Sequence, residues 1–421
     1  MAALLRTGAY LDSCRAAGMD PDALGAAFGL LEGWVEEGTL PGAAALVQRG
    51  GRIAGEAYFG STARDGRRVD SDTLWGLASI TKTFTATALM LLVERGALCL
   101  DEPLTGLLPE LAEQPEPEGP PDARRDAQAV TARHLLSHCS GLPGFSRDNL
   151  ELRKHRRPLE DFVTSFLREP LLFEPGSLHL YSSVGIGLVA EVVGRAITGT
   201  LGAKPPSPMA SCLGPFLDSE LLAPLGMDRT SLCPPEAWYE EIAFIEGTER
   251  QDPGWGVNSP YFRRLGLPWG GLVSRPRDLA RFVDLFLPSA CGRPRFEGVA
   301  STGSLVSRPT VHAMTSVQAK PPDAPLEMAL PLRDGAPPPR RRAFVPWGLG
   351  WAINGIRHQF FGDLNAPSAY GHIGSMGTMA WGDPELDVVC VVLTNRGLSS
   401  GWTLQRPRQS LFSKAVVASA L

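Results

Sequence analysis

The sequence predicts an α/β protein whose antiparallel sheet is formed by segments from both ends of the chain and flanked by helices. Three observations support this fold class. Strand-like runs follow one another near the N-terminus, similar runs recur near the C-terminus, and helical patterns and loops fill the stretch between them. Because pairing the two ends closes the sheet most economically, we expect a mainly helical domain inserted within the sheet domain.

The individual elements follow from local patterns. Residues 21–38, PDALGAAFGLLEGWVEEG, repeat apolar residues at helical spacing and end on a glycine, which predicts a helix. Residues 42–50 and 52–60 are predicted strands, separated by two glycines that indicate a hairpin. Near the other end, LGWAING, GTMAWGD and LDVVCVVLTNRG are predicted strands, and QSLFSKAVVASAL is a predicted closing helix.

The length of 421 residues exceeds the size at which a single core usually stops growing, so we expect two structural lobes. Residues 1–21 are expected to form an N-terminal extension, residues 22–100 and 266–421 the α/β sheet domain, and residues 101–265 the mainly helical inserted domain. Three proline-rich stretches are predicted loops: EQPEPEGPPDARRD, GAKPPSPMASCLGP and KPPDAPLEMALPLRDGAPPPRRR.

Composition excludes several kinds of partner. The net charge is −5 and the only dense basic run is the short RRR at residues 340–342, so neither nucleic acid nor an anionic membrane is an expected partner. Seven scattered cysteines without a CxxC motif indicate neither a disulfide framework nor a zinc ribbon, and favour a cytoplasmic location. The N-terminal apolar run is short and contains Arg6, and no later window approaches an uninterrupted membrane span.

One stretch, LWGLASITKTFTATALMLLVERGAL, places Lys82 among small and apolar residues, where a charge is costly. If a helix begins near Ser79, Ser79 and Lys82 lie three residues apart on one face, which is the S-x-x-K arrangement of nucleophilic catalysis. A desolvated lysine has a lowered pKa and can accept the serine proton. The rival interpretation is a lysine that snorkels to the helix end.

Two distant segments add to this motif. FEPGSLHLYSSVGIG places a tyrosine before a helix, and AYGHIGSMGTMAWGD contains His-x-Gly at the start of a predicted strand. With Ser79 and Lys82, these are the three motifs of the serine β-lactamase-like superfamily, in the expected chain order. From about Leu40 to Gly397 the chain resembles the class C branch, which includes the β-lactamase-fold esterases (family VIII carboxylesterases) and D-aminopeptidases. The resemblance implies a β-lactamase/transpeptidase-like fold.

The resemblance also implies catalytic roles. Ser79 is the expected acylated nucleophile and Lys82 its hydrogen-bonded partner. Tyr181, in Tyr-Ser-Ser, is the expected tyrosine that shares the proton relay and protonates the leaving group. Because a nearby cation stabilises a phenolate, we expect Lys82 to lower the pKa of Tyr181.

Further residues match the second and third motifs. His372 and Gly374 are expected to lie on the strand that flanks the site, and the backbone N–H groups of Ser79 and Ser375 to form the oxyanion hole. Two departures point away from β-lactams. Ser183 stands where the family usually has asparagine, and His372, largely neutral at pH 7, stands where a lysine usually attracts the antibiotic carboxylate. Both favour small-molecule esters or amides that lack that carboxylate.

Other constellations are weaker candidates. Ser399 in GLSSG matches the G-x-S-x-G pattern, but all seven histidines precede it, so a surface loop is expected. His134 and His138 are four residues apart and could share a helix face, but they lack the H-E-x-x-H glutamate and a third ligand, so no metal site is expected.

The remaining histidines and the tryptophans have ordinary explanations. His155 is expected on a solvated surface, His179 and His358 are isolated, and the tryptophans 269, 347 and 351 are expected in the core or the cleft wall. No glycine-rich nucleotide loop is present, so no cofactor is expected.

These observations predict a serine hydrolase that works through an acyl-enzyme on esters or amides. The alternatives are an acyltransferase with the same Ser-Lys-Tyr site, a D-amino-acid peptidase or amidase, a weak β-lactamase, and a catalytically silent binding protein. The silent protein is disfavoured because Ser79, Lys82 and Tyr181 are all present.

Overall fold

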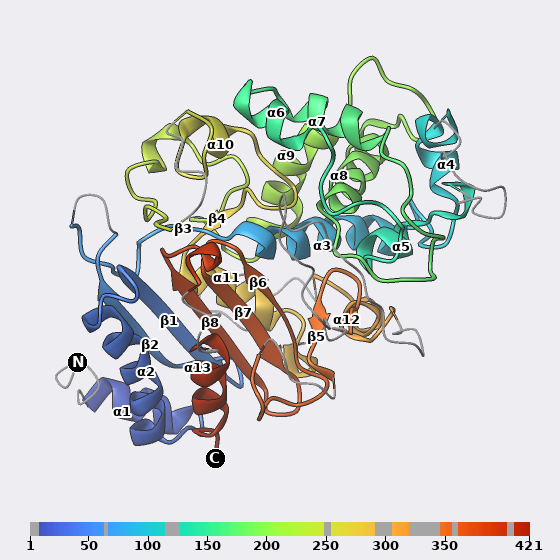
Figure 1. Ribbon diagram of the computed structural model, residues 1–421. Helices are drawn as coiled ribbons and strands as arrows, with labels where there is room; N and C mark the ends of the chain where they lie inside the picture. The colour runs from blue at the N-terminus through green and yellow to red at the C-terminus, as the bar shows by residue number, and fades with distance from the viewer. Residues whose placement is uncertain are drawn as a thin grey trace.

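The computed structural model describes residues 8–62, 66–113, 127–247, 254–290, 305–319, 346–355, 361–401 and 408–421. Its main sheet has six antiparallel strands in the order β2-β1-β8-β7-β6-β5 (Figure 1). The strands are β1 (Gly42–Arg49), β2 (Arg52–Gly60), β5 (Ala352–Ile353), β6 (Tyr370–Gly374), β7 (Thr378–Asp383) and β8 (Val388–Thr394). A second, two-stranded sheet pairs β3 (Trp75–Gly76) with β4 (Val273–Ser274).

The central strands are buried on both faces, and their side chains divide between two cores. In β1, Ala44 and Leu46 face one core, whereas Ala43, Ala45 and Val47 face the other. β8 divides in the same way, as expected from the two-residue repeat of a strand. The valine, leucine and alanine content of these runs therefore explains why they occupy the middle of the sheet.

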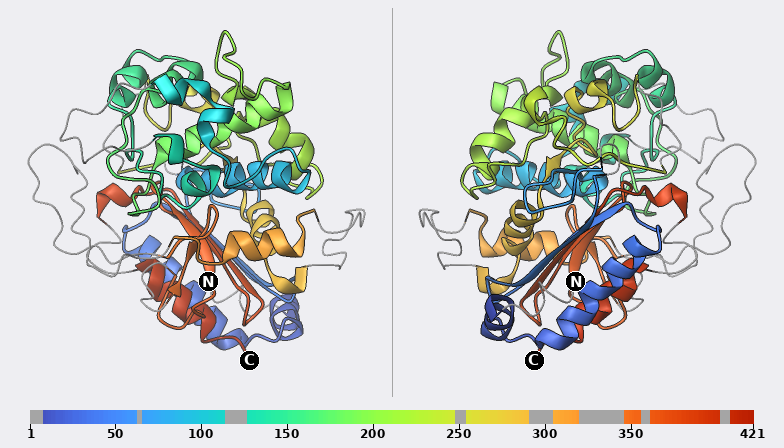
Figure 2. Two further views of the ribbon diagram at one scale, coloured as in Figure 1. Left: turned by 90° about the vertical axis from the view of Figure 1, so that its right-hand side faces the viewer. Right: turned by 90° about the vertical axis from the view of Figure 1, so that its left-hand side faces the viewer.

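Helices cover both faces of the sheet (Figures 1 and 2). One face carries α2 (Pro21–Glu36) and α13 (Arg408–Val417), which pack on each other, and α1 (Gly8–Ala16) lies against β2. α2 begins where the Asp20 carboxylate accepts the N–H groups of Asp22 and Ala23, with proline at its first position. The opposite face carries α11 (Pro276–Asp284), which contacts β1, β7 and β8.

The helical part of the molecule is centred on α3 (Thr81–Glu94) and α8 (Ser183–Thr198), which pack against each other. One continuous core joins this part to the α11 face of the sheet. The other helices are α4 (Leu104–Leu107), α5 (Ala132–Leu136), α6 (Asn149–Lys154), α7 (Leu159–Phe166), α9 (Leu213–Leu217), α10 (Pro260–Arg264) and α12 (Arg308–Thr315).

The structure confirms the predicted fold class, and it corrects several details. In LGWAING only Ala352–Ile353 forms a strand. GAKPPSPMASCLGP is not simply a loop, because its end forms a short 3-10 turn and enters α9, and Met209 packs so tightly that a side chain at Gly194 would clash with it. Most of the other two proline-rich stretches, residues 114–126 and 320–342, lies outside the described residues. The division into residues 22–100, 101–265 and 266–421 stays a prediction.

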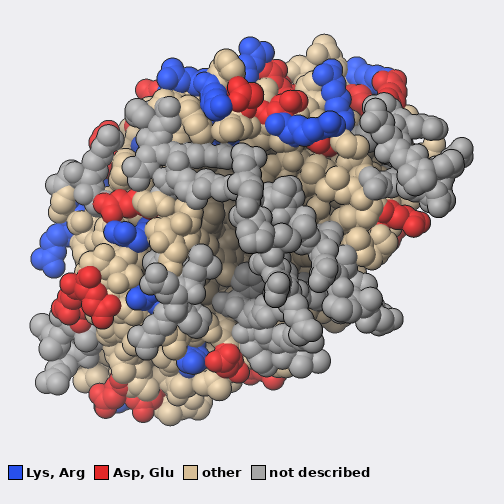
Figure 3. Space-filling model, viewed as in Figure 1, with Lys and Arg blue, Asp and Glu red and all other residues tan. Residues whose placement is uncertain are grey.

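The surface is of mixed charge. On the face shown in Figure 3, lysine and arginine side chains are interspersed with aspartate and glutamate. No helix in the part of the chain that the structure describes is long and apolar enough to cross a bilayer.

Candidate active site

Helix α3 is buried over nearly its whole length, although every second residue of its first two turns is a threonine. The threonine hydroxyls are satisfied by carbonyl groups: Thr81 donates to Ala78, Thr83 to Ile80, Thr85 to Pro268 and Thr87 to Thr83. Because each buried hydroxyl has a partner, the helix can enter the core without the cost of unpaired polar groups. This placement also carries Lys82 out of solvent.

Ser79 lies in a 3-10 turn, Ala78–Ile80, that leads directly into α3. Two hydrogen bonds hold Leu77 at the start of this turn, from its N–H to Leu272 O (2.8 Å) and from Thr378 Oγ1 to its carbonyl (3.0 Å). The next residue, Ala78, adopts φ +49°, a left-handed conformation that is unfavourable for alanine. Hydrogen bonds to Leu272 and Thr378 thus fix the residue that precedes the turn, and Ser79 within the turn is partly exposed.

Lys82 is 1% exposed, and its Nζ lies 3.2 Å from Ser79 Oγ. Burial lowers the pKa of Lys82 from its usual value near 10.5 to about 7. A substantial fraction of the amine is therefore neutral at neutral pH and able to accept a proton. The snorkelling interpretation is wrong, because the ammonium end is buried rather than solvated.

The second partner of Lys82 is a backbone group that the sequence did not reveal. Lys82 Nζ donates to the carbonyl oxygen of Trp269 at 2.7 Å. The segment around Trp269 is fastened to α3 by the Thr85 bond to Pro268 O (2.6 Å) and by Leu272 N–H to Thr81 Oγ1 (3.0 Å). Trp269 therefore acts through its main chain, which its residue type does not mark.

Tyr181 comes directly before Ser182, the N-cap residue of α8, whose Oγ accepts the Gly185 N–H at 2.9 Å. Lys82 Nζ lies 4.9 Å from the centre of the phenol ring. Burial raises the pKa of Tyr181, and the interaction with the Ser79 side chain opposes this only in part. The expectation that Lys82 lowers the pKa of Tyr181 is wrong, because desolvation of the phenolate outweighs the influence of an amine that is itself partly neutral.

His372 is buried on β6, and its Nε2 lies 3.4 Å from the hydroxyl of Tyr181. Its Nδ1 lies 2.8 Å from the carbonyl oxygen of Ile373, so Nδ1 carries the hydrogen and Nε2 is the acceptor. Burial, together with Lys82, lowers the pKa of His372 to about 3. The imidazole is therefore neutral at pH 7, and its Nε2 accepts a hydrogen bond from the hydroxyl of Tyr181.

Strand β6 ends at Gly374, so His-x-Gly lies at the end of this strand and not at its start. The chain turns there into β7 through Gly377, whose φ is +97°. A Cβ at Gly374 would come within 2.2 Å of Leu77 O, which explains the glycine: the strand passes directly against the turn that carries Ser79. The exposed Ser375 follows at once, so its backbone lies next to this turn.

Ser183 is the first residue of α8 and is 2% exposed. Its backbone N–H donates to Gly144 O at 2.8 Å. The structure therefore brings Ser79, Lys82, Tyr181 and His372 together, with Gly374 and Ser375 beside them, whereas Ser183 is anchored within the helix start.

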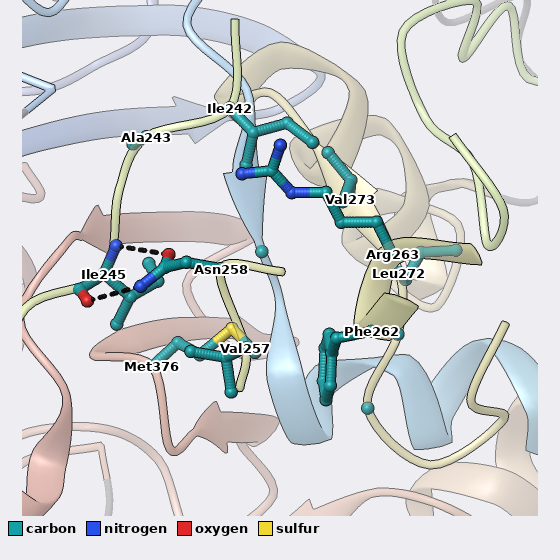
Figure 4. A pocket seen from close by; sticks show the side chains of 13 residues that line it. Ile242, Ala243, Ile245, Val257, Asn258, Phe262, Arg263, Leu272, Val273 and Met376 are labelled. Carbon is teal, nitrogen blue, oxygen red and sulfur yellow. Dashed lines mark hydrogen bonds between the residues drawn. The ribbon is translucent and has the colours of Figure 1, made fainter. Parts of the chain in front are cut away.

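A pocket borders the small β3–β4 sheet, and none of Ser79, Lys82, Tyr181 and His372 lines it (Figure 4). Asn258 forms one of its edges and is held by two 2.9 Å hydrogen bonds with the backbone of Ile245. The lining is mostly apolar and consists of Gly76, Ile242, Ala243, Ile245, Val257, Asn258, Phe262, Arg263, Gly270, Gly271, Leu272, Val273 and Met376.

The other candidate residues have clear positions. Ser399 is exposed in a short turn, and its hydroxyl donates to Gly247 O at 2.8 Å. His134 and His138 do not share a helix face, because α5 ends at Leu136 and His138 has φ +59°. Within the described ranges, no group of three or more His, Cys, Asp or Glu side chains is placed to hold a metal ion.

His155 is exposed, as expected, whereas His179 is not isolated. Its ring centre lies 6.0 Å from that of His138 and 5.7 Å from that of Trp347. Trp347 also borders the Tyr181 ring, at 5.6 Å between centres. His358 lies outside the described residues.

Comparisons with known proteins bear on the family and the fold of the chain. A family model described as Beta-lactamase matches residues 27–410. The chain is 28% identical over 403 residues to Esterase EstB of Burkholderia gladioli, covering 88% of this chain and 90% of that protein. It is 25% identical over 390 residues to N-acetylmuramyl-L-alanine amidase of Bacillus subtilis (strain 168), covering 85% and 77%. Among solved structures, a novel penicillin-binding protein homolog from Caulobacter crescentus matches with a TM-score of 0.69 at 22% identity, covering 96% of this chain and 99% of that one.

Proposed function

Because the chain belongs to the beta-lactamase family of serine hydrolases, we propose that it cleaves carboxylic esters or amides of small molecules through an acyl-enzyme on Ser79. The observation that carries this proposal is the Ser79–Lys82 pair. A buried amine with a pKa of about 7 lies 3.2 Å from a partly exposed hydroxyl, so base and nucleophile are already in hydrogen-bond contact.

In the first step, the neutral amine of Lys82 takes the proton of Ser79 as Oγ attacks the substrate carbonyl carbon. The developing oxyanion accepts hydrogen bonds from the backbone N–H groups of Ser79 and Ser375. When the tetrahedral intermediate collapses, Tyr181 gives its proton to the departing alcohol or amine and regains one from the Lys82 ammonium. Water then attacks the carbonyl carbon of the acyl-enzyme while its proton passes to Lys82. When this second tetrahedral intermediate collapses, the Lys82 ammonium returns that proton to Ser79 Oγ, so the acid is released with the serine and the neutral amine restored.

The surroundings of the site support an uncharged substrate. His372 is neutral at pH 7 and points its acceptor nitrogen at Tyr181, so it supplies no positive charge for a substrate carboxylate. The relation to Esterase EstB favours esters among the possible substrates. We accordingly expect nitrocefin, an anionic β-lactam, to be hydrolysed slowly compared with p-nitrophenyl acetate.

The test combines labelling with turnover. A fluorophosphonate probe is expected to add once to the wild-type protein by intact mass, and p-nitrophenyl acetate is expected to be hydrolysed. Ser79→Ala should abolish both. Ser399→Ala is the matched control, because Ser399 is an exposed serine in a G-x-S-x-G sequence, and this variant should behave as wild type. Unchanged labelling of Ser79→Ala, or loss of labelling in Ser399→Ala, would refute the assignment of the nucleophile.

A further inference from the structure

The loop that follows α5 places His138 beside Tyr181, although the mechanism above gives His138 no part. His138 is 1% exposed and adopts φ +59°, a conformation that non-glycine residues seldom occupy. Its ring centre lies 4.6 Å from that of Tyr181. A buried residue in an unfavourable conformation next to a reactive side chain calls for a physical explanation.

His138 accepts the backbone N–H groups of the two residues that flank Tyr181. Its backbone carbonyl accepts the N–H of Leu180 at 2.8 Å, and its ring nitrogen Nδ1 accepts the N–H of Ser182 at 3.2 Å. The carbonyl of His138 therefore binds the residue before Tyr181, and the ring of His138 binds the residue after it. The main chain at Tyr181 is clamped by a single residue, with the imidazole also packed on the phenol ring.

The ring must be neutral to make this contact. Nδ1 accepts a hydrogen bond, so the one hydrogen of the neutral imidazole is on Nε2, which is buried and has no hydrogen-bond partner within the described ranges. Burial lowers the pKa of His138 well below its usual value, and His179, Lys82 and His372 add to the shift. Protonation would put a hydrogen on Nδ1, facing the Ser182 N–H, and would break the clamp.

The rest of the loop is fastened independently of the imidazole. Backbone hydrogen bonds join Gly176 N–H to Cys139 O, Leu172 N–H to Gly141 O and Ser183 N–H to Gly144 O, at 2.7 to 2.8 Å. These contacts hold the loop against the segment that leads to α8. Removal of the ring alone should therefore loosen Tyr181 without releasing the loop.

We propose that His138 is a positioning residue that holds Tyr181 in place to donate its proton to the leaving group. This inference rests on the proposed function, in which Tyr181 is that donor. General acid catalysis contributes about 100- to 10,000-fold, and small misplacements of a catalytic group cost a large part of such a contribution. If Tyr181 is loosened, kcat/KM should therefore fall most for the substrates whose leaving groups most need a proton.

The main test variant is His138→Gly, since glycine accepts the positive φ and keeps the carbonyl that binds Leu180, so that only the ring is lost. kcat/KM is measured for p-nitrophenyl acetate, phenyl acetate and ethyl acetate, whose leaving groups increasingly need protonation. His138→Gly is expected to lose at least about tenfold more activity on ethyl acetate than on p-nitrophenyl acetate. Labelling by the fluorophosphonate probe, which expels fluoride, should stay within about twofold of wild type.

Three further variants make the result specific. His138→Asn should restore the wild-type dependence on the leaving group, because asparagine tolerates the left-handed conformation and its amide oxygen can accept the Ser182 N–H. His134→Asn is the matched control, a half-buried histidine four residues earlier, and should leave all rates unchanged. His138→Gly in a Tyr181→Phe background should add less than about a twofold loss, because the two residues act as one unit.

Equal losses on all three esters, or additive losses in the double variant, would overturn the inference while the proposed function stands. If the loss in Tyr181→Phe is itself the same for all three esters, the inference falls together with the proton-donor role of Tyr181, and the labelling of Ser79 still decides the acyl-enzyme. Thermal melting of every variant identifies a protein that does not fold. If His138→Gly is such a protein, His138→Ala is compared with His138→Asn: the inference stands if the alanine variant alone loses at least about tenfold more activity on ethyl acetate than on p-nitrophenyl acetate, and falls if both variants keep the wild-type ratio.

Discussion

The burial of Lys82 predicts how the acylation rate of Ser79 varies with pH. Only the neutral amine can take the serine proton, and with a pKa of about 7 its neutral fraction falls from about 90% at pH 8 to about 1% at pH 5. The acylation rate should therefore fall roughly 90-fold over this range. A lysine of ordinary pKa would be about 0.3% neutral at pH 8, and the rate would still rise about tenfold per pH unit above it.

The histidines near the site are not expected to titrate near pH 7, where the acylation rate is predicted to change. Burial lowers the pKa of His179 to about 4, and burial together with Lys82 lowers that of His372 to about 3. The pKa of His138 also lies well below its usual value, again mainly because of burial. Lys82 is therefore the group at the site expected to titrate near pH 7.

The assay is the second-order rate of labelling by the fluorophosphonate probe, followed by intact mass at pH values from 5 to 9.5. Circular dichroism at each pH verifies that the protein stays folded. Lys82→Arg carries a permanent charge and should label slowly at every pH. Lys154→Arg changes an exposed lysine in the same way and should follow the wild-type curve. A wild-type rate that is flat between pH 5 and 8, or that keeps climbing tenfold per unit above pH 8.5, would refute the role given to the buried amine.

Three further predictions concern neighbouring groups. Lys82→Met should stabilise the protein at pH 6.5, because a lysine whose folded pKa is lowered to about 7 costs the most stability below that pH. The cost, and with it the gain from methionine, should decrease as the pH rises toward the ordinary lysine pKa near 10.5. Urea unfolding at pH 6.5 and pH 10 measures the difference, and a pH-independent difference would contradict the shifted pKa. Tyr181→Phe should fold normally but lose more kcat/KM on ethyl acetate than on p-nitrophenyl acetate; equal losses would remove the tyrosine from leaving-group protonation. Gly374→Ala forces a Cβ to within about 2 Å of Leu77 O and should cost about 1 to 3 kcal/mol together with most of the activity; a wild-type melting temperature would show that the turn yields freely.

The sequence predicted the parts of the site that periodicity and residue type encode. Ser79 and Lys82 are three residues apart at the start of a helical pattern, and the structure brings their side chains together. Tyr181 and His372 are far apart in the chain, and only the resemblance to a family with three motifs placed them near Ser79. Their 3.4 Å contact follows from the antiparallel sheet and the start of α8, which no local pattern specifies.

Other features could not be predicted because they depend on tertiary packing. The carbonyl of Trp269 binds Lys82, and a backbone oxygen has no residue type to mark it. The direction of the Tyr181 pKa shift depends on how completely the phenol is desolvated, which the sequence does not give. His138 looked like a neighbour of His134 on a helix, but a left-handed residue separates it from α5 and turns it toward Tyr181.

The pairing of β1 with β8 has a consequence for how the protein folds. Ala43 pairs with Thr394, so the inner edge of the β1–β2 hairpin has no partner until nearly the whole chain has been synthesised. Pairings of such long sequence separation form slowly, and an open apolar strand edge is prone to aggregate in the meantime. Truncation before β8 should therefore yield insoluble chains, even though Ser79, Lys82, Tyr181 and His372 would all still be present.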